Sequence, residues 1–125
     1  MHVNQHATIP THHLPGLEHQ TLAGRRDGLK SFEIWRQTIA PKSATPVHCH
    51  DCDEVIVVLR GRAECRVGDQ VLPFNAEESL VIPSGVVHQI VNPGDEDLYI
   101  MATLAMAPVQ VKAADGTPMP LPWNA

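Results

Sequence analysis

The stretch from His48 to Glu54, HCHDCDE, places three kinds of metal-binding side chain within seven positions. Its two histidines and its glutamate suit an open metal site, whereas its two cysteines favour zinc or redox chemistry. The kind of secondary structure that carries the stretch determines which of these side chains can act together.

Turn-forming residues recur along the whole chain, and helical periodicity is scarce. Eleven prolines and eight glycines separate short runs rich in Val, Ile and Leu. This pattern is typical of an all-β sandwich or barrel. The expected strands are 32–39, 45–50, 54–60, 62–67, 70–74, 79–82, 86–92 and 98–105.

Local patterns add detail to this all-β prediction. Residues 17–23 are expected to form a helical turn that ends at Gly24, and the Pro-rich end, TPMPLPWNA, is expected to run extended. In RAECRV, alternation places Cys65 on the face toward the core. The run VIVVL is apolar on both faces, which predicts a strand covered by a second sheet or by a partner subunit.

Alternation along a strand also separates the side chains of HCHDCDE. His48 and His50 point to one face, whereas Cys49 points to the opposite face. Glu54 begins the next expected strand, from which it can reach the same centre. Two imidazoles and one carboxylate suit a divalent first-row transition metal. His88, which follows the Pro-x-Gly turn in IPSGVVHQIVN, is the fourth candidate ligand.

Two spaced motifs in the chain resemble the two signatures of the cupin superfamily. They are His48-x-His50-x3-Glu54-x6-Gly61 and Pro83-x-Gly85-x2-His88-x3-Asn92. The second signature normally opens with a glycine, but Glu77 stands at that position, which puts the shape of the turn before strand 79–82 in doubt. The resemblance implies a double-stranded β-helix of the jelly-roll type, with a metal ion at the mouth of the barrel. The implied ligands are His48, His50, Glu54 and His88.

The implied metal centre is open, because four protein ligands leave one or two positions free on a five- or six-coordinate ion. One divalent transition metal ion is expected, and Fe, Mn, Ni, Zn and Cu are all compatible with the ligand set. Cupins with similar ligands include dioxygenases, isomerases, decarboxylases and lyases. We expect a small metal-dependent enzyme that acts on a small organic molecule, with a dioxygenase as the first hypothesis. The alternative is a non-catalytic module that binds or senses a small ligand through the metal.

The resemblance covers residues 48–92, and the whole chain is long enough for a single domain over residues 1–125. The metal-binding core is expected at about 32–105. An N-terminal extension, 1–31, precedes this core, and a Pro-rich C-terminal tail, 106–125, follows it.

Other reactive side chains have simpler interpretations. Cys49 and Cys52 could form a redox pair, but no βαβ context surrounds them, and surface or interface positions are favoured. Histidines also gather near the N-terminus, where a solvated, flexible segment is favoured over a second, weak metal site. These histidines are His2, His6, His12, His13 and His19.

Aromatic and amide side chains near the motifs are candidates for the pocket wall. Trp35 is expected to pack on the sheet, and Trp123 could either pack or line a pocket. Contacts to the metal ligands or to a substrate could come from Arg36, Gln37 and Gln89.

Charge and hydropathy exclude several kinds of partner. The chain has 14 acidic and 9 basic residues, a net charge of -5, and no basic segment, so nucleic acid is not expected. It contains no apolar run long enough for a membrane span and no signal-like start, so a cytoplasmic protein with reduced thiols is expected. Because the run 55–59 is apolar on both faces, we also expect a homodimer that covers the outer face of this strand.

Overall fold

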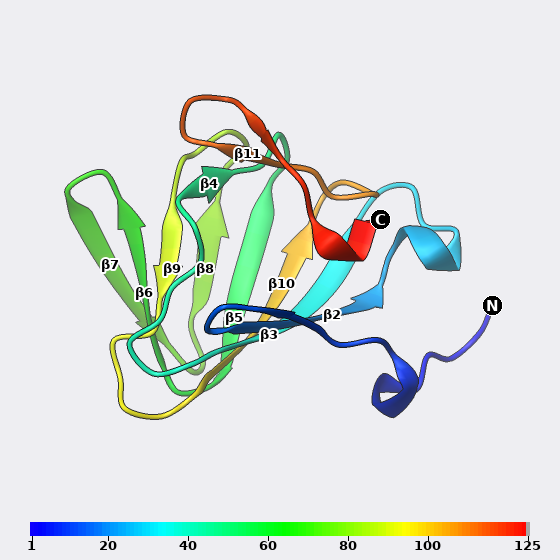
Figure 1. The fold of residues 1–125 in the computed structure, drawn as a ribbon, viewed down its shortest axis with the longest axis horizontal. Coiled ribbons are helices and arrows are strands. Elements are labelled where there is room, and N and C mark those ends of the chain that lie inside the picture. The colour runs from blue at the N-terminus through cyan, green and yellow to red at the C-terminus, as the bar shows by residue number, and fades with distance from the viewer. Residues whose placement is uncertain (125) are drawn as a thin grey trace.

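The computed structural model describes residues 1–124 as an all-β fold with three short 3-10 helices (Figure 1). The elements in chain order are η1 (His6–Thr8), β1 (His12–Leu14), β2 (Leu17–Ala23), η2 (Arg25–Asp27), β3 (Glu33–Ile39), β4 (His48–Cys49), β5 (Glu54–Arg60), β6 (Arg62–Val67), β7 (Gln70–Asn75), β8 (Ser79–Ile82), β9 (Gln89–Val91), β10 (Leu98–Leu104), β11 (Val111–Ala113), β12 (Pro118–Met119) and η3 (Pro122–Asn124). Within residues 1–124, no helix has the length and apolar character that crossing a membrane requires.

The strands form one large sheet and two small ones. The large sheet has six strands in the order β1-β2-β3-β10-β5-β8, and the small sheets have the orders β7-β6-β9 and β12-β11-β4. In the large sheet, β10 pairs antiparallel with both β3 and β5. The N-terminal strands β1 and β2 extend this sheet beyond β3.

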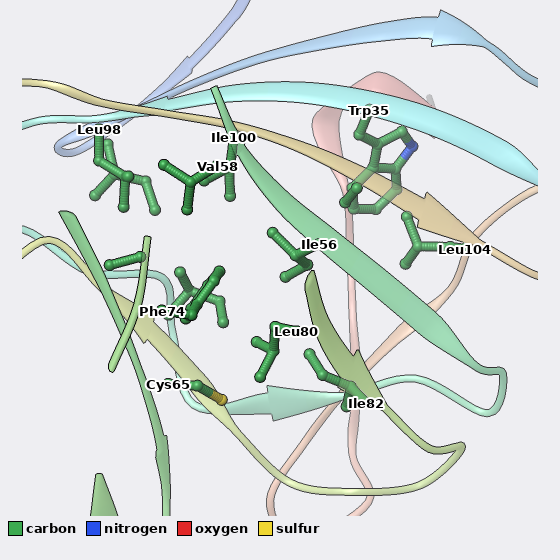
Figure 2. Close-up of a cluster of buried hydrophobic side chains, with 14 of the residues drawn as sticks. Trp35, Ile56, Val58, Cys65, Phe74, Leu80, Ile82, Leu98, Ile100 and Leu104 are labelled. Carbon is green, nitrogen blue, oxygen red and sulfur yellow. The ribbon is translucent and has the colours of Figure 1, made fainter. Parts of the chain in front are cut away.

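The hydrophobic core lies between the large sheet and the sheet of β6, β7 and β9 (Figure 2). Ile56 and Val58 from β5 are buried on the inner face, where Phe74 of β7 and Cys65 of β6 belong to the same cluster. Burying a large aliphatic side chain stabilises a fold by roughly 1.5–3 kcal/mol. The predicted inward orientation of Cys65 is confirmed, because this side chain is buried.

Several predicted strands are found at the expected positions. The strands Glu54–Arg60, Arg62–Val67 and Ser79–Ile82 agree with the expected ranges. The expected strands 45–50 and 86–92 are shorter, because regular pairing is confined to His48–Cys49 and Gln89–Val91.

The predicted helical turn at residues 17–23 is wrong, because this segment forms strand β2 and pairs antiparallel with β3. Leu17 and His19 are buried, whereas Glu18 between them is exposed, which is the alternation of a half-buried strand. Pairing with β3 supplies hydrogen-bond partners that an isolated helical turn would lack.

Two non-ligand residues of the motifs shape turns between strands. Gly61 has a φ of 99°, and a Cβ atom at this position would lie 2.8 Å from the carbonyl oxygen of Asp97. The amide of Asn92 donates to the carbonyls of Ile39 and Glu96, and its oxygen accepts from the backbone N–H of Gly94. These two residues are therefore structural, since they connect neighbouring strands.

The turn before β8 keeps a left-handed backbone although its motif position lacks glycine. Glu77 has a φ of 68°, a conformation that costs a residue with a Cβ atom roughly 1–2 kcal/mol. The neighbouring Glu78 helps to hold this turn, because its carboxylate accepts from the backbone N–H of Asn75 at 2.8 Å.

Replacing Glu77 with Gly is expected to raise the free energy of unfolding by about 1 kcal/mol, because glycine adopts positive φ without steric cost. Urea unfolding of the parent and the variant measures this difference. Glu78→Gly is the matched control, and it should destabilise the chain because it removes the bond to Asn75. Equal or lower stability of the Glu77→Gly variant would contradict the prediction.

Candidate metal and ligand site

Backbone hydrogen bonds hold the two motifs together at the site. His48 and His88 face each other in an antiparallel bridge, with the N–H of each donating to the carbonyl of the other at 2.9 and 2.8 Å. The N–H of Gly85 donates to the carbonyl of His50 at 2.8 Å. The turn at 83–85 thus fixes the second motif against the first.

The four predicted ligands lie together at this junction. The centroid of the His48 ring is 5.0 Å from that of His50 and 4.5 Å from that of His88. The His50 and His88 rings are farther apart, at 6.3 Å. Oxygen Oε1 of Glu54 lies 3.4 Å from Nε2 of His88 and 4.0 Å from Nε2 of His50.

Each of the three imidazoles is held by a backbone carbonyl. Nδ1 of His48 lies 2.6 Å from the carbonyl oxygen of Pro46, and Nδ1 of His88 lies 2.8 Å from that of Val86. Nδ1 of His50 lies 2.7 Å from the carbonyl oxygen of Gln110. A carbonyl oxygen only accepts, so each Nδ1 carries the proton and each neutral ring keeps the lone pair on Nε2.

The centre of the site contains polar atoms without partners. Oε1 of Glu54 and Nε2 of His88 are fully buried, and neither has a hydrogen-bond partner among residues 1–124. As these side chains stand, no group of three or more His, Cys, Asp or Glu residues in that part of the chain is arranged to hold a metal ion. The site therefore has a suitable donor set with unused lone pairs, but the donors are not closed around one point.

Burial and neighbouring charge act differently on two of the rings. Burial lowers the pKa of His48 to about 4, and the nearby His88 adds to this effect, so the His48 ring is neutral at pH 7. Burial also disfavours a charged His88 ring, but the Glu54 carboxylate and the Val86 carbonyl outweigh it and raise the pKa of His88. His88 is therefore the ring of this pair that keeps a proton to higher pH.

A cavity of about 100 Å³ opens beside the four side chains. Its wall is mainly apolar and includes Trp35, Ile56, Ile90, Ile100 and Val111. Besides the four candidate ligands, the described lining contains no Asp, Glu, His, Cys, Tyr, Lys or Arg. The cavity thus combines a polar end, made by the candidate ligands, with a mainly apolar wall.

The C-terminal segment forms part of the wall of this cavity. Met119, Pro120, Leu121 and Trp123 line the cavity, and we call residues 119–123 the C-terminal cap. This segment follows β11, which pairs with β4 and so brings the end of the chain to the site (Figure 1). The amide of Asn124 donates to the carbonyl of Val109, which anchors the last turn.

One histidine of the N-terminal group is buried against this cap, so the prediction of a solvated segment is wrong for His19. Its side chain is 1% exposed, and its ring stacks on Trp123 with a centroid distance of 3.5 Å and an interplanar angle of 9°. The prediction is wrong for this residue because β2 pairs with β3, which buries Leu17 and His19 on one face of the strand. The alternation of Leu17 and His19 in LEHQTLA was the available signal.

Of the surface or interface positions predicted for Cys49 and Cys52, the surface alternative is wrong, because both side chains are buried. Burial raises the pKa of Cys52 to about 11, and the Glu54 carboxylate adds to this effect, so its thiol is protonated at neutral pH. The cysteines at positions 49, 52 and 65 are all free thiols.

The other candidate wall residues separate into two groups. Trp35 is buried in the core as expected and also lines the cavity, together with Gln37. Arg36 lines a groove away from the candidate ligands, and Gln89 donates to the carbonyl of Thr45.

Comparison with solved structures defines the fold as that of a cupin, as expected. A Cupin 2 conserved barrel domain protein from Salinispora arenicola has a TM-score of 0.67 and 27% identity, over 84% of this chain and 87% of that chain. The polyketide cyclase RemF from Streptomyces resistomycificus has a TM-score of 0.75 and 20% identity, over 87% and 83% of the two chains. Because its identity is low, the second comparison supports the fold alone.

Sequence comparison then identifies the family. The chain matches the Auxin binding protein family over residues 2–123, and it belongs to this family. It is 37% identical over 107 residues to auxin-binding protein 1 of Arabidopsis thaliana. The aligned region covers 78% of this chain and 54% of that protein. The chain thus spans about half the length of this curated relative.

Burial of His19 predicts a dependence of stability on pH. Burial lowers the pKa of His19 to about 3, and the nearby His12 adds to this effect. Between pH 6.5 and 3 the unfolded chain therefore binds more protons than the folded chain. Acidification in this range should reduce the free energy of unfolding by about 1.4 kcal/mol per pH unit on account of this residue.

The His19→Gln variant of the metal-free chain should show a correspondingly flatter dependence between pH 6 and 4, measured by urea unfolding. His13 is exposed, so His13→Gln is the matched control and should keep the slope of the parent. The same slope in the parent and in His19→Gln would show that His19 is not held neutral by the fold.

Proposed function

We propose that this chain is a metal-dependent binding protein for a small, mainly apolar ligand that carries a carboxylate group, such as an auxin. The observation that carries this proposal is the cavity wall, which is mainly apolar and meets the candidate ligands at one end. Most ligand sites combine an apolar wall with a few polar groups that fix the orientation of the ligand. Family membership supports the same class of ligand, because the curated relatives are named auxin-binding proteins.

The residues at the polar end fit a divalent transition metal ion. His48, His50 and His88 would bind it through Nε2, and Glu54 through its carboxylate, after small movements that close the four side chains around the ion. The unpartnered Oε1 of Glu54 and Nε2 of His88 support this assignment, because buried polar atoms usually have partners. When bound, the ion supplies a positive charge and open positions for a ligand carboxylate.

The chain itself supplies orientation and exclusion of water. The carbonyls that accept from Nδ1 hold the three rings with Nε2 free for the ion, as carbonyl partners commonly do at metal sites. Trp35 and the aliphatic residues beside it exclude water from the rest of the ligand. Gln37 and Thr45 are the uncharged polar side chains of the described wall, and they can orient a bound molecule.

Binding explains this wall better than catalysis does. The dioxygenase, isomerase, lyase and decarboxylase activities considered from the sequence would generally use an acid or base beside the reacting atoms. The described lining offers no ionisable side chain for this role beyond the four candidate ligands. The second hypothesis from the sequence, a non-catalytic binding module, is therefore the one that we adopt.

The His48→Ala/His50→Ala double variant is expected to lose both metal and ligand binding while the barrel stays folded. Elemental analysis should give one divalent metal ion per parent chain and less than about one tenth of this content in the variant, because two of four ligands are removed. Calorimetry with indole-3-acetate, an auxin, should show binding to the metal-loaded parent alone.

His6→Ala/His13→Ala is the matched control, since it removes two exposed histidines outside the site and should keep both metal and ligand binding. Full metal content in the His48→Ala/His50→Ala variant would contradict the metal assignment. Equal affinity of the metal-loaded and metal-stripped parent for indole-3-acetate would contradict metal-dependent binding.

We further propose that the chain forms a homodimer through the outer face of the large sheet. Val55 and Leu59 of β5 are 39% and 48% exposed, and Val81 of β8 is 68% exposed. Val55 and Val81 are paired in register, so they form one apolar surface. Closed two-fold pairing is the commonest way in which soluble proteins cover such a surface.

Light scattering coupled to size exclusion should therefore give twice the chain mass of 13.7 kDa for the parent at micromolar concentration. Val55→Asp/Val81→Asp should give the mass of a single chain, because charges on this surface oppose its burial. Leu72→Asp changes an exposed residue of β7 in another sheet and should remain dimeric. A monomeric parent would contradict the dimer.

A further inference from the structure

We propose that His19 is a positioning residue that couples the C-terminal cap to the wall of the ligand cavity. Its ring face contacts the cap, and its ring edge contacts a polar side chain of the wall. This inference rests on the proposed ligand-binding function. His19 does not itself line the cavity, so it acts through Trp123 and Gln37, which do.

The ring face holds the cap through stacking. His19 and Trp123 are stacked at 3.5 Å, and Trp35 meets both rings edge-on, at 4.8 Å from His19 and 5.4 Å from Trp123. Nε1 of Trp123 is buried and has no hydrogen-bond partner among residues 1–124. Aromatic packing, rather than a hydrogen bond from its indole, therefore holds Trp123 in place.

The ring edge holds the wall through hydrogen bonds. The amide nitrogen of Gln37 donates to Nδ1 of His19 at 3.0 Å, because an amide NH2 group only donates. Nε2 of His19 consequently carries the proton and donates to Oγ1 of Thr21 at 2.8 Å. Thr21 on β2 and Gln37 on β3 thus fix the plane of the same ring that stacks on Trp123.

The size of the cavity gives this coupling a role in binding. At about 100 Å³ the cavity is smaller than the roughly 300 Å³ at the lower end of ligand pockets. A ligand therefore needs more room than the cavity offers, and an outward movement of the cap, with Trp123 leaving its stack on His19, would supply it. The stacked face and the hydrogen-bonded edge belong to one ring, so closure of the cap and placement of the wall amide are coupled through His19.

Two substitutions separate the two contacts. His19→Phe keeps an aromatic face for Trp123 but removes the acceptor for Gln37. His19→Asn keeps an acceptor near the position of Nδ1 but removes the stacked ring. Each is measured in the full metal-loaded chain by calorimetry with indole-3-acetate and by acrylamide quenching of tryptophan fluorescence without ligand. Trp123→Phe identifies the part of the quenching signal that comes from Trp123.

His19→Phe should lower the affinity for indole-3-acetate about fivefold, since one hydrogen bond to the wall is lost, and should leave the quenching of Trp123 unchanged. His19→Asn should raise the quenching of Trp123 about twofold or more, because the cap opens more often. A purely structural role would instead change both readouts together in both variants, and this result would overturn the proposal.

A double-mutant cycle tests the coupling itself. Trp123→Leu also changes the cavity wall, so it should lower the affinity at least as much as His19→Asn, and the double variant should lose no more than Trp123→Leu alone, because the two substitutions break the same contact. Additive losses would overturn the proposal.

If His19→Phe does not fold, the double-mutant cycle still tests whether His19 and the cap are coupled. If the parent fails to bind indole-3-acetate, the proposed function fails, while the quenching comparison still tests the contact between His19 and the cap.

Discussion

The site depends on three hydrogen bonds between imidazole Nδ1 atoms and backbone carbonyls. They fix both the tautomer and the direction of each ring, so that His48, His50 and His88 turn their Nε2 lone pairs away from the supporting backbone. Two of the carbonyls lie two residues before the histidine that they hold, whereas the third comes from Gln110, which is 60 residues beyond His50. The site is therefore complete only when the segment that leads to β11 has docked against the first motif.

The same docking brings the end of the chain over the cavity. Strand β11 pairs with β4, and the C-terminal cap that follows lines the same cavity as the candidate ligands. One packing event thus anchors His50 and encloses the apolar wall. Enclosure strengthens the attraction between a bound ion and a ligand carboxylate, because water no longer screens it. A binding protein gains affinity from this arrangement without any group that transfers protons.

The features of the fold and the site that the sequence predicts depend on local patterns, namely the alternation of side chains along a strand and the spacing of motif residues. Alternation along a strand placed His48 and His50 on one face, and motif spacing added Glu54 and His88. The contact of Gln110 with His50 was not predictable, because no local pattern connects residues so distant in the chain. His19 was missed for a different reason, since its alternation was present but short, and a histidine in a polar segment usually lies in solvent. The burial of Cys49 and Cys52 likewise depends on how the turn at 51–53 packs, which the sequence does not specify.

Anomalous diffraction from crystals of the metal-loaded chain tests the central claim most directly. We predict one strong anomalous peak about 2.0–2.2 Å from Nε2 of the three motif histidines and from the carboxylate of Glu54, with each Nδ1 still bonded to its carbonyl. A peak at the N-terminal histidines instead, or a well-ordered site without any peak after metal loading, would contradict the account.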